Sequence, residues 1–429
     1  TRATAATYVN ASGNIATAAS GELRYTYDPV TLASLGVLIE EARTNSIRNP
    51  RGEGAGSAPT YWSSGGAGSG VTITRGSDTT ITGLSASTWR IAGTASASLN
   101  VFIRFDTTSA SLSQIWTQCQ SVQIVADSVA AGVVCSTSVI ERDAGSAFLT
   151  QGLTTFVPSA TVTRPSGTRT LSNASVAQVQ GGINIAIPNG TTVGFTLAIA
   201  APQLELGAFA STPILPAVGT PAASTRGADL VSASLASLGI PANGACTVLM
   251  TCMLPQAAPS GAGQAIVCFD DGTSNNRFLL QNFAGGSGIY GARTLGGLAA
   301  NVLAGTMTLS AAFAVGMTVD GTARLAISYG GAAVVSVTGG PVSGLTIARI
   351  GNTATGASAL SGDITYLDII RAPVSNPHLQ PLWGAQCHRG KWRNGNSAAP
   401  NKAEPLREER EDESGLGEGE VSANADPGT

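Results

Sequence analysis

Two adjacent carboxylates, Glu40 and Glu41, are the first residues whose types suggest chemistry, within the stretch LGVLIEEARTN at 35–45. Glycoside cleavage commonly uses two carboxylates that flank one bond. The preceding run from Leu35 to Ile39 is apolar and typical of a buried strand, and neighbouring strand residues point to opposite faces. The two carboxylates are therefore not expected to share an active site.

Histidine chemistry is restricted to His378 and His388, the two histidines of the chain. Neither lies in a G-x-S-x-G pattern, where a nucleophilic serine would be expected. Cys387 directly precedes His388, and adjacent residues of an extended chain are poor partners for proton transfer. The sequence therefore predicts no enzyme.

Oxygen ligands gather in FDDGTSNNRF, residues 269–278, where Asp270, Asp271 and Asn275 surround a turn. Calcium prefers carboxylate and amide oxygens, but the alternating acidic spacing of an EF-hand is missing. The favoured interpretation is a hairpin turn with Gly272 at a positive φ. A calcium site at Asp270, Asp271 and Asn275 is the weaker alternative, and no other cofactor is expected.

Four aromatic residues are candidates for stacking on sugar rings: Tyr61, Trp62, Trp89 and Trp116. A flat ring offers apolar area to one face of a pyranose. Tryptophan in a β-sandwich more often lies in the core, so these residues are candidates for either role. A glycan-binding role for all four is kept as a hypothesis.

The elements that must position these residues are strands. Charged residues are 11% of the chain and 53 of its 429 residues are glycine, a composition that favours strands and turns over helices. The segment LNVFIRF alternates, with Val101, Ile103 and Phe105 on one face. Turn residues around Leu325–Tyr329 predict a hairpin with AVVSV. The expected class is all-β.

The chain is long enough for two or three domains, and turn-rich stretches divide it. We expect two β-sandwich domains, an N-terminal extension and an acidic C-terminal tail. The expected segments are 1–50 as an N-terminal signature segment and docking element, 51–211 as the first sandwich, 212–225 as a linker, 226–386 as the second sandwich, and 387–429 as the tail.

Charge and cysteine content exclude several classes. From Asn401 onward there are nine acidic and three basic side chains, a net −6, and the remainder carries +3, which is too little for nucleic-acid binding. No apolar run is long enough to span a membrane. The six cysteines contain no CxxC pair, so buried free thiols are favoured, with a Cys119–Cys135 contact across a hairpin left open.

The opening stretch resembles a signature of tail and minor structural proteins of tailed bacteriophages and prophages. In that family an aromatic-valine opening is followed by an Asp-Pro turn and by Leu-Leu-Ile-Glu-Glu-Ala-Arg-Thr-Asn. Leu23 and Tyr25, which flank Arg24, depart mildly from it. The matching residues here are Tyr8, Val9, Asp28, Pro29, Leu38, Ile39, Glu40, Glu41, Ala42, Arg43, Thr44 and Asn45.

Two further stretches extend the resemblance over about residues 1–385. LSGDITYLDII together with DDGTSNNRF resembles a laminin-G or concanavalin-like sandwich. Another stretch resembles the closing strand of a carbohydrate-binding-module-like jelly roll and the entry into the next domain, with Leu215 as a one-residue departure. Its matching residues are Gln203, Leu204, Glu205, Gly207, Ile214, Pro216, Thr225, Arg226, Ala228 and Asp229.

The resemblance implies a virion protein on the phage exterior, first of all a tail fibre or tail-associated protein that binds a host-surface glycan. Its implied partners are other copies of itself, as a trimer by analogy with phage fibres, other tail or capsid proteins, and host glycan. A head fibre or capsid decoration protein is the alternative, and a polysaccharide depolymerase is a weaker one. Glu40, Glu41, Arg43 and Asn45 are expected to form a hydrogen-bonded clasp at a junction.

Overall fold

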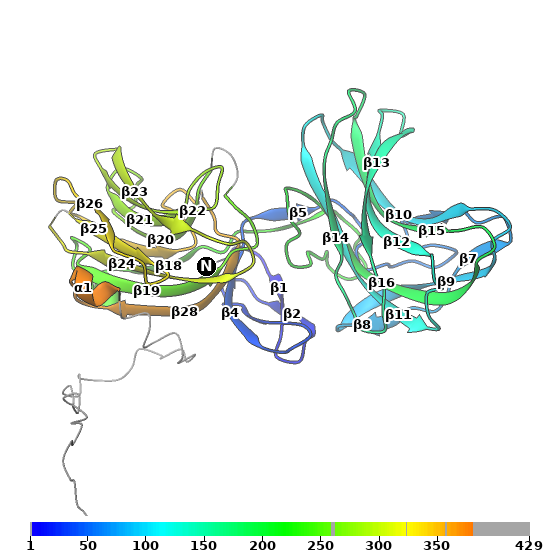
Figure 1. Cartoon of the computed structure of the whole chain (residues 1–429), viewed down its shortest axis with the longest axis horizontal. Helices are drawn as coiled ribbons and strands as arrows, with labels where there is room; N and C mark the ends of the chain where they lie inside the picture. Colours follow the sequence, from blue (N-terminus) through cyan, green and yellow to red (C-terminus); the bar gives the residue numbers. More distant parts are fainter. Residues whose placement is uncertain (1, 259–261, 323, 357, 381–429) are drawn as a thin grey trace, which may run out of the picture. The chain divides into compact units, whose positions relative to one another are not determined.

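The computed structural model describes residues 2–258, 262–322, 324–356 and 358–380. It is built almost entirely of antiparallel strands, which confirms the all-β prediction (Figure 1). In these residues no helix is long and apolar enough to cross a membrane. One short helix, α1, spans Asn376–Leu379. The expected acidic tail, with Cys387 and His388, lies outside the described residues.

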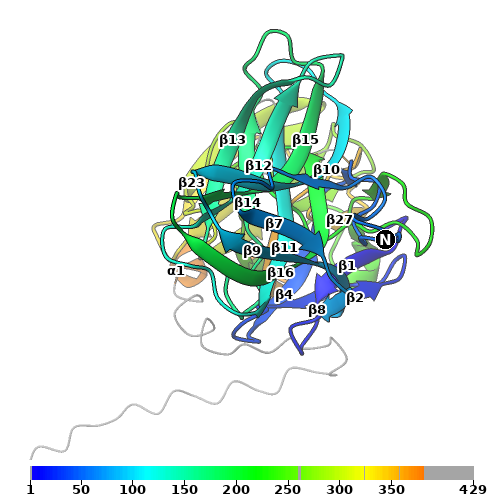
Figure 2. The same cartoon turned by 90° about the vertical axis from the view of Figure 1, so that its right-hand side faces the viewer.

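The first sandwich pairs two antiparallel sheets (Figure 1, Figure 2). One sheet has five strands in the order β13-β12-β15-β10-β6, and the other has six, with β14-β11-β16-β9-β7 in line and β8 beside β9. The strands are β6 (Ser63–Gly65), β7 (Val71–Arg75), β8 (Thr79–Ile81), β9 (Leu84–Thr94), β10 (Leu99–Ser109), β11 (Ile115–Ala126), β12 (Val134–Arg142), β13 (Phe148–Phe156), β14 (Ser166–Thr170), β15 (Gln178–Ile187) and β16 (Thr192–Leu206).

Alternating apolar residues from the two sheets fill this sandwich. Val101, Ile103 and Phe105 of β10 all lie in its core, as the alternation in LNVFIRF predicted. Trp62 packs edge-on against Phe105, with ring centroids 4.8 Å apart. Burial of such rings and branched side chains stabilises the fold by roughly 2 kcal/mol per side chain.

The second sandwich has a six-stranded sheet, β18-β27-β20-β21-β22-β23, and a seven-stranded sheet, β26-β25-β24-β19-β28-β4-β3. The predicted hairpin of Leu325–Tyr329 is confirmed as β25 paired with β26. Besides β3 and β4, the strands of the second sandwich are β18 (Val231–Ser234), β19 (Cys246–Met253), β20 (Gln264–Asp270), β21 (Arg277–Asn282), β22 (Gly288–Leu295), β23 (Leu298–Thr306), β24 (Ala312–Val319), β25 (Leu325–Tyr329), β26 (Val335–Val337), β27 (Ile347–Ile350) and β28 (Gly362–Ile370), with a 3-10 turn at Ala236–Leu238.

Two strands of the N-terminal segment, β3 and β4, belong to the seven-stranded sheet of the second sandwich, while β1-β2 and β5-β17 form two-stranded sheets of their own. β4 (Ser34–Ile39) pairs with β28, and β3 (Tyr25–Tyr27) pairs with β4. Gly36 has φ +94°, and a Cβ there would lie 2.2 Å from the Ile364 carbonyl oxygen, so only glycine allows this approach. The remaining strands of this region are β1 (Ala6–Val9), β2 (Ile15–Ala18), β5 (Arg43–Asn45) and β17 (Ser224–Arg226).

The expected linker, 212–225, is tied down at both ends. Thr212 hydrogen-bonds to Glu40, and β17 pairs with β5 from Ser224 onward. The cysteines agree with the favoured interpretation. Within the described residues Cys119, Cys135, Cys246, Cys252 and Cys268 are buried free thiols.

Candidate functional site

The outer face of the five-stranded sheet carries polar side chains at strand-alternate positions. Because Val101, Ile103 and Phe105 face the core, Phe102 and Arg104 of β10 face away from it. We call this surface, formed by Phe102, Arg104, Ser138, Arg142, Gln180, Gly182 and Asn184, the arginine face.

Arg104 lies flat across the neighbouring strand. It is paired in register with Gly182 of β15, which is in turn paired with Ser138 of β12. Nη1 of Arg104 donates to Ser138 Oγ at 3.2 Å and to the Ile183 carbonyl at 3.1 Å. A Cβ at position 182 would lie 2.9 Å from Nη1, so the glycine makes room for the side chain.

A second arginine, Arg142, lies on the same face, four residue pairs beyond the Ser138–Gly182 pair. Its Nε and Nη2 donate to Gln180 Oε1 at 2.9 and 2.7 Å, and its Nη1 donates to the Ser146 carbonyl at 2.7 Å. Gln180 Nε2 donates to the Phe105 carbonyl at 2.8 Å, which fixes this pair to the backbone. Arg142 is therefore held in place by neutral acceptors.

The Arg104 charge has no opposite charge beside it. The side chain is nearly buried, with 9% of the residue exposed, and the described part of the chain gives it no ion-pair partner. Burial, and secondly the positive charge of Arg142, lower the pKa of Arg104 to about 10. The guanidinium remains charged at neutral pH in an environment that disfavours its charge.

Only one edge of the Arg104 guanidinium is occupied. Nη1 has both of the hydrogen bonds, and Nε and Nη2 have no protein acceptor among the described residues. Neither atom is sealed from solvent, since neither is among the fully buried unpartnered atoms of the described chain. The free edge therefore has two N–H donors left for a ligand.

An aromatic ring and a pair of amides lie next to Arg104 along the arginine face. The Arg104 guanidinium lies 4.6 Å from the centroid of the Phe102 ring, and Asn184 Nδ2 donates to Asn100 Oδ1 at 3.1 Å. A Cβ at Gly65 would lie 2.7 Å from the Phe102 ring, so this glycine leaves room for the ring. A ring beside amide and guanidinium donors can contact both the faces and the hydroxyls of a sugar.

Three of the four aromatic candidates are not available for stacking. Trp62, Trp89 and Trp116 are 6%, 0% and 5% exposed and belong to the core of the first sandwich, so their assignment to sugar stacking is corrected. Burial of large rings between the sheets is the physical reason. Tyr61 is 43% exposed, and one face of its ring is covered by the Arg48 guanidinium at 3.8 Å.

The calcium candidates are explained by the protein's own contacts. Asp270 is buried and accepts from Arg349 Nε at 2.6 Å, while Asp271 accepts from Thr273 and Asn276. Asn275 lies in the turn between β20 and β21, and Gly272 has the expected positive φ. The favoured hairpin turn is present, and no group of three His, Cys, Asp or Glu side chains that could hold a metal ion occurs in the described residues.

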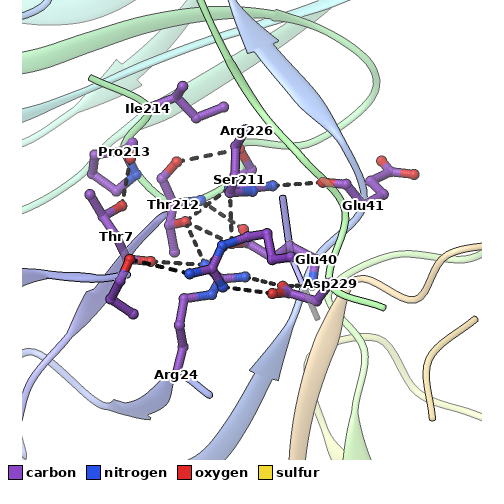
Figure 3. A network of polar contacts seen from close by, with 12 residues as sticks. Thr7, Arg24, Glu40, Glu41, Ser211, Thr212, Pro213, Ile214, Arg226 and Asp229 are labelled. Carbon is purple, nitrogen blue, oxygen red and sulfur yellow. Dashed lines mark hydrogen bonds and ion pairs between the residues drawn. The ribbon is translucent and has the colours of Figure 1, made fainter. Parts of the chain in front are cut away.

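Of the residues expected to form a clasp, Glu40 lies at the centre of a buried polar network (Figure 3). Glu40 is 4% exposed and its carboxylate accepts from Arg24 Nη1 at 2.5 Å and from both N and Oγ1 of Thr212. Arg226 forms a second ion pair with Glu40 at 2.9 Å. Glu40 therefore joins β4 to the chain just beyond β16.

Asp229 completes this network, which we call the Glu40 network: Arg2, Arg24, Glu40, Thr212, Arg226 and Asp229. Figure 3 labels all of these residues except Arg2. Asp229 Oδ1 accepts from Arg2 at 2.9 Å, and Oδ2 accepts from Arg24 and from the Glu40 backbone N–H. Two buried carboxylates thus bind three buried arginines. Residues from two of the three signature stretches meet here.

The other predicted clasp residues lie beside the network. Glu41 lies between β4 and β5, and its side chain points away from that of Glu40 and pairs with Arg43. Arg43 also donates to the Leu206 carbonyl and lies 4.4 Å from the centroid of the Phe209 ring. Asn45 is fully buried and its Nδ2 donates to the Pro202 and Ile214 carbonyls at 3.1 Å each.

Opposite electrostatic effects act on two neighbouring acids. Burial would raise the pKa of Glu40, but Arg226 and Arg24 lower it to about 2. Asp363 is paired in register with Leu38 of β4, and burial, and secondly the Glu40 charge, raise its pKa to about 7. Glu40 is ion-paired with two arginines and its pKa falls, whereas Asp363 forms no such pair in the described chain and its pKa rises.

Comparisons with known proteins found only weak likeness and do not indicate the function of this chain. No family model matches the sequence, and no curated protein matches it. Solved structures resemble it weakly. A tailspike protein 4 domain of bacteriophage CBA120 is 13% identical over 38% of this chain and 21% of that one, with a TM-score of 0.27, so the chain spans about a fifth of that protein.

Two carbohydrate-binding modules show similar levels of likeness. The CBM40 of a Ruminococcus gnavus sialidase is 15% identical, covering 34% of this chain and 85% of that one, with a TM-score of 0.29. The xylan-binding CBM22-1 of Paenibacillus barcinonensis Xyn10C is 14% identical, covering 39% and 94%, with a TM-score of 0.25.

Proposed function

We propose that this chain is a structural protein of a phage virion that binds host-surface glycan through the arginine face. The observation that carries the glycan proposal is the free Nε and Nη2 edge of Arg104 beside the Phe102 ring. Glycan sites combine a ring with a few fixed polar groups in this way. The rigid strands β10, β12 and β15 hold those groups in place.

The virion part of the proposal is supported by the sequence signature, whose Glu40 and Asn45 are buried in polar contacts. Attachment at the tail exterior fits a protein that recognises a cell surface. Several copies, as in a trimer, would add avidity to weak single sites.

A glycan array with the folded, full-length chain tests the binding part. We expect binding to a subset of bacterial surface glycans, and we expect the substitution Arg104→Gln to abolish or strongly reduce it. Arg90→Gln is the matched control, because Arg90 lies on β9 of the other sheet in an exposed pair with Asp127. Binding to no glycan on the array and to no host cell contradicts the adhesive function. Labelling the chain on intact particles then separates a tail position from a capsid position.

A further inference from the structure

The unpaired charge of Arg104 distinguishes the arginine face from an ordinary polar sheet surface. Buried or nearly buried charges are normally paired, because desolvation of an isolated ion is costly. Among the described residues, four other arginines are at most 9% exposed, and three of them have a carboxylate partner: Arg2, Arg24 and Arg226. The fourth, Arg293, donates to the Gly340 carbonyl. Arg104 has neutral acceptors at Nη1 and none elsewhere in the described chain.

The free edge has the geometry that binds a carboxylate. Nε–H and Nη2–H of a guanidinium point in parallel and match the two oxygens of one carboxylate. The chain itself uses this edge elsewhere. Arg349 donates to Asp270 through Nε at 2.6 Å and Nη2 at 3.3 Å, and Arg48 donates to Asp106 through the same two nitrogens.

We propose that the Nε and Nη2 edge of Arg104 binds the carboxylate of an acidic sugar, so that the glycan recognised by this face is anionic. This inference rests on the proposed function and names its class of ligand. It follows from one open bidentate donor edge held on a rigid sheet, with no carboxylate of the described chain to fill it.

Arg142 supports the same ligand without touching it. Its donors are occupied by Gln180 and Ser146, both through neutral oxygens, so its charge is not cancelled. The two positive charges disfavour each other, as the lowered pKa of Arg104 indicates. An anion bound between solvent and Arg104 relieves that repulsion, whereas a neutral sugar does not.

A purely structural role for Arg104 is the competing explanation. In that case the guanidinium only covers Phe102 and ties β10 to β12 through Ser138. Such a role predicts a loss of stability on substitution and no discrimination between charged and neutral glycans. The two explanations therefore differ in ligand selectivity, which stability alone does not report.

The test compares oligosaccharides that carry uronic or nonulosonic acids with their carboxyl-reduced counterparts, on the wild-type chain and on Arg104→Gln, Arg104→Lys and Arg90→Gln. We expect the wild type to prefer the acidic member by roughly tenfold to a hundredfold, the range for a hydrogen bond to a charged group. Arg104→Gln should lose that preference, Arg104→Lys should keep part of it as a point charge, and Arg90→Gln should keep all of it.

Each other outcome has a separate meaning. Equal binding of acidic and reduced glycans overturns the anionic ligand and leaves glycan binding intact. Binding of neither sugar class contradicts the proposed function itself. A preference for sulfated over carboxylated glycans overturns the carboxylate. If Arg104→Gln fails to fold by circular dichroism, the wild-type comparison and Arg104→Lys still decide the question.

Discussion

At the scale of single residues, the same side-chain type has different consequences according to its partner. Arg24 is fully buried between the carboxylates of Glu40 and Asp229, and these charges raise its pKa against the effect of burial. Arg104 is nearly as buried but lacks a carboxylate, and its pKa is lowered. We assign Arg24 a structural role at a junction, and we assign the unpaired Arg104 the role of contacting a ligand.

The Glu40 network predicts unequal effects for two adjacent glutamates. Glu40→Gln leaves Arg24 and Arg226 short of one buried negative charge, so unfolding free energy at neutral pH should fall by about 3–5 kcal/mol. Glu41→Gln is the matched control, because Glu41 is partly exposed and pairs with Arg43 alone, so its effect should stay within about 1 kcal/mol. Urea denaturation of both variants measures this.

The Glu40 effect should also depend on pH in a defined direction. The folded-state pKa of Glu40, about 2, lies below its ordinary value, so its contribution is present at neutral pH and is lost as pH falls from about 4.5 toward 2. The difference between wild type and Glu40→Gln should therefore shrink in acid. A difference that is constant from pH 7 to pH 3 would contradict this role.

Asp363 predicts the opposite dependence. Its folded-state pKa, about 7, lies above its ordinary value, so the neutral carboxyl is favoured in the folded protein and stability falls as pH rises from about 4 to 7. The free energy of unfolding of Asp363→Asn should equal that of the wild type near pH 4. At pH 8 it should be higher by up to about 4 kcal/mol, the free energy that corresponds to the pKa shift. Denaturation midpoints across that range check it, and equal midpoints at pH 8 would exclude a buried, charge-sensitive Asp363.

At the scale of elements, alternation along the sequence predicted which face of a strand is buried but not what lies opposite. Val101, Ile103 and Phe105 were placed in the core from LNVFIRF, and the same parity points Arg104 outward. The partners of Arg104, Gly182 and Ser138, lie on strands far along the chain, and only the register of β10, β15 and β12 brings them together. Local pattern carries no information on that register.

The structure of the N-terminal signature was also predicted only in part. The strand before Glu40 and the divergence of Glu40 and Glu41 follow from sequence, and β4 confirms the buried strand. Arg24 was noted only as flanked by unusual residues, since nothing near it shows that it meets Asp229 across 205 positions. The hypothesis that the tryptophans stack on sugars was wrong for a different reason. Residue type alone does not separate a ring in the core from a ring at the surface.

Position 36 predicts how tightly β4 must fit against β28. Gly36→Ala should destabilise the fold by several kcal/mol, because the new Cβ would meet the Ile364 backbone and the positive φ strains any side chain. Gly21→Ala is the control, since Gly21 also has a positive φ, +78°, but no atom within 4 Å of the added Cβ, so about 1 kcal/mol is expected. Thermal denaturation of both variants compares crowding with backbone strain alone, and equal losses would show that β4 does not need this contact.

At the scale of the whole molecule, the sequence order and the spatial order of the strands differ. The seven-stranded sheet ends with β28, β4 and β3, so strands from residues 25–39 close a sheet whose other members span 246–370. The expected division at residue 50 describes the sequence composition but not this sheet. The proposed adhesive role is assigned to the first sandwich, while the signature segment completes the second.

This pairing has a consequence for the way the chain is made. A ribosome produces Val37, Leu38 and Ile39 early, but their partner residues in β28 emerge more than 320 positions later. Until then only β3 can pair with this apolar strand, and the edge that will meet β28 has no partner. Closing so long a loop slows folding and favours association with neighbouring chains. A proteolytic fragment that starts after β4 would leave β28 as an unpaired edge strand, and such a fragment should tend to aggregate.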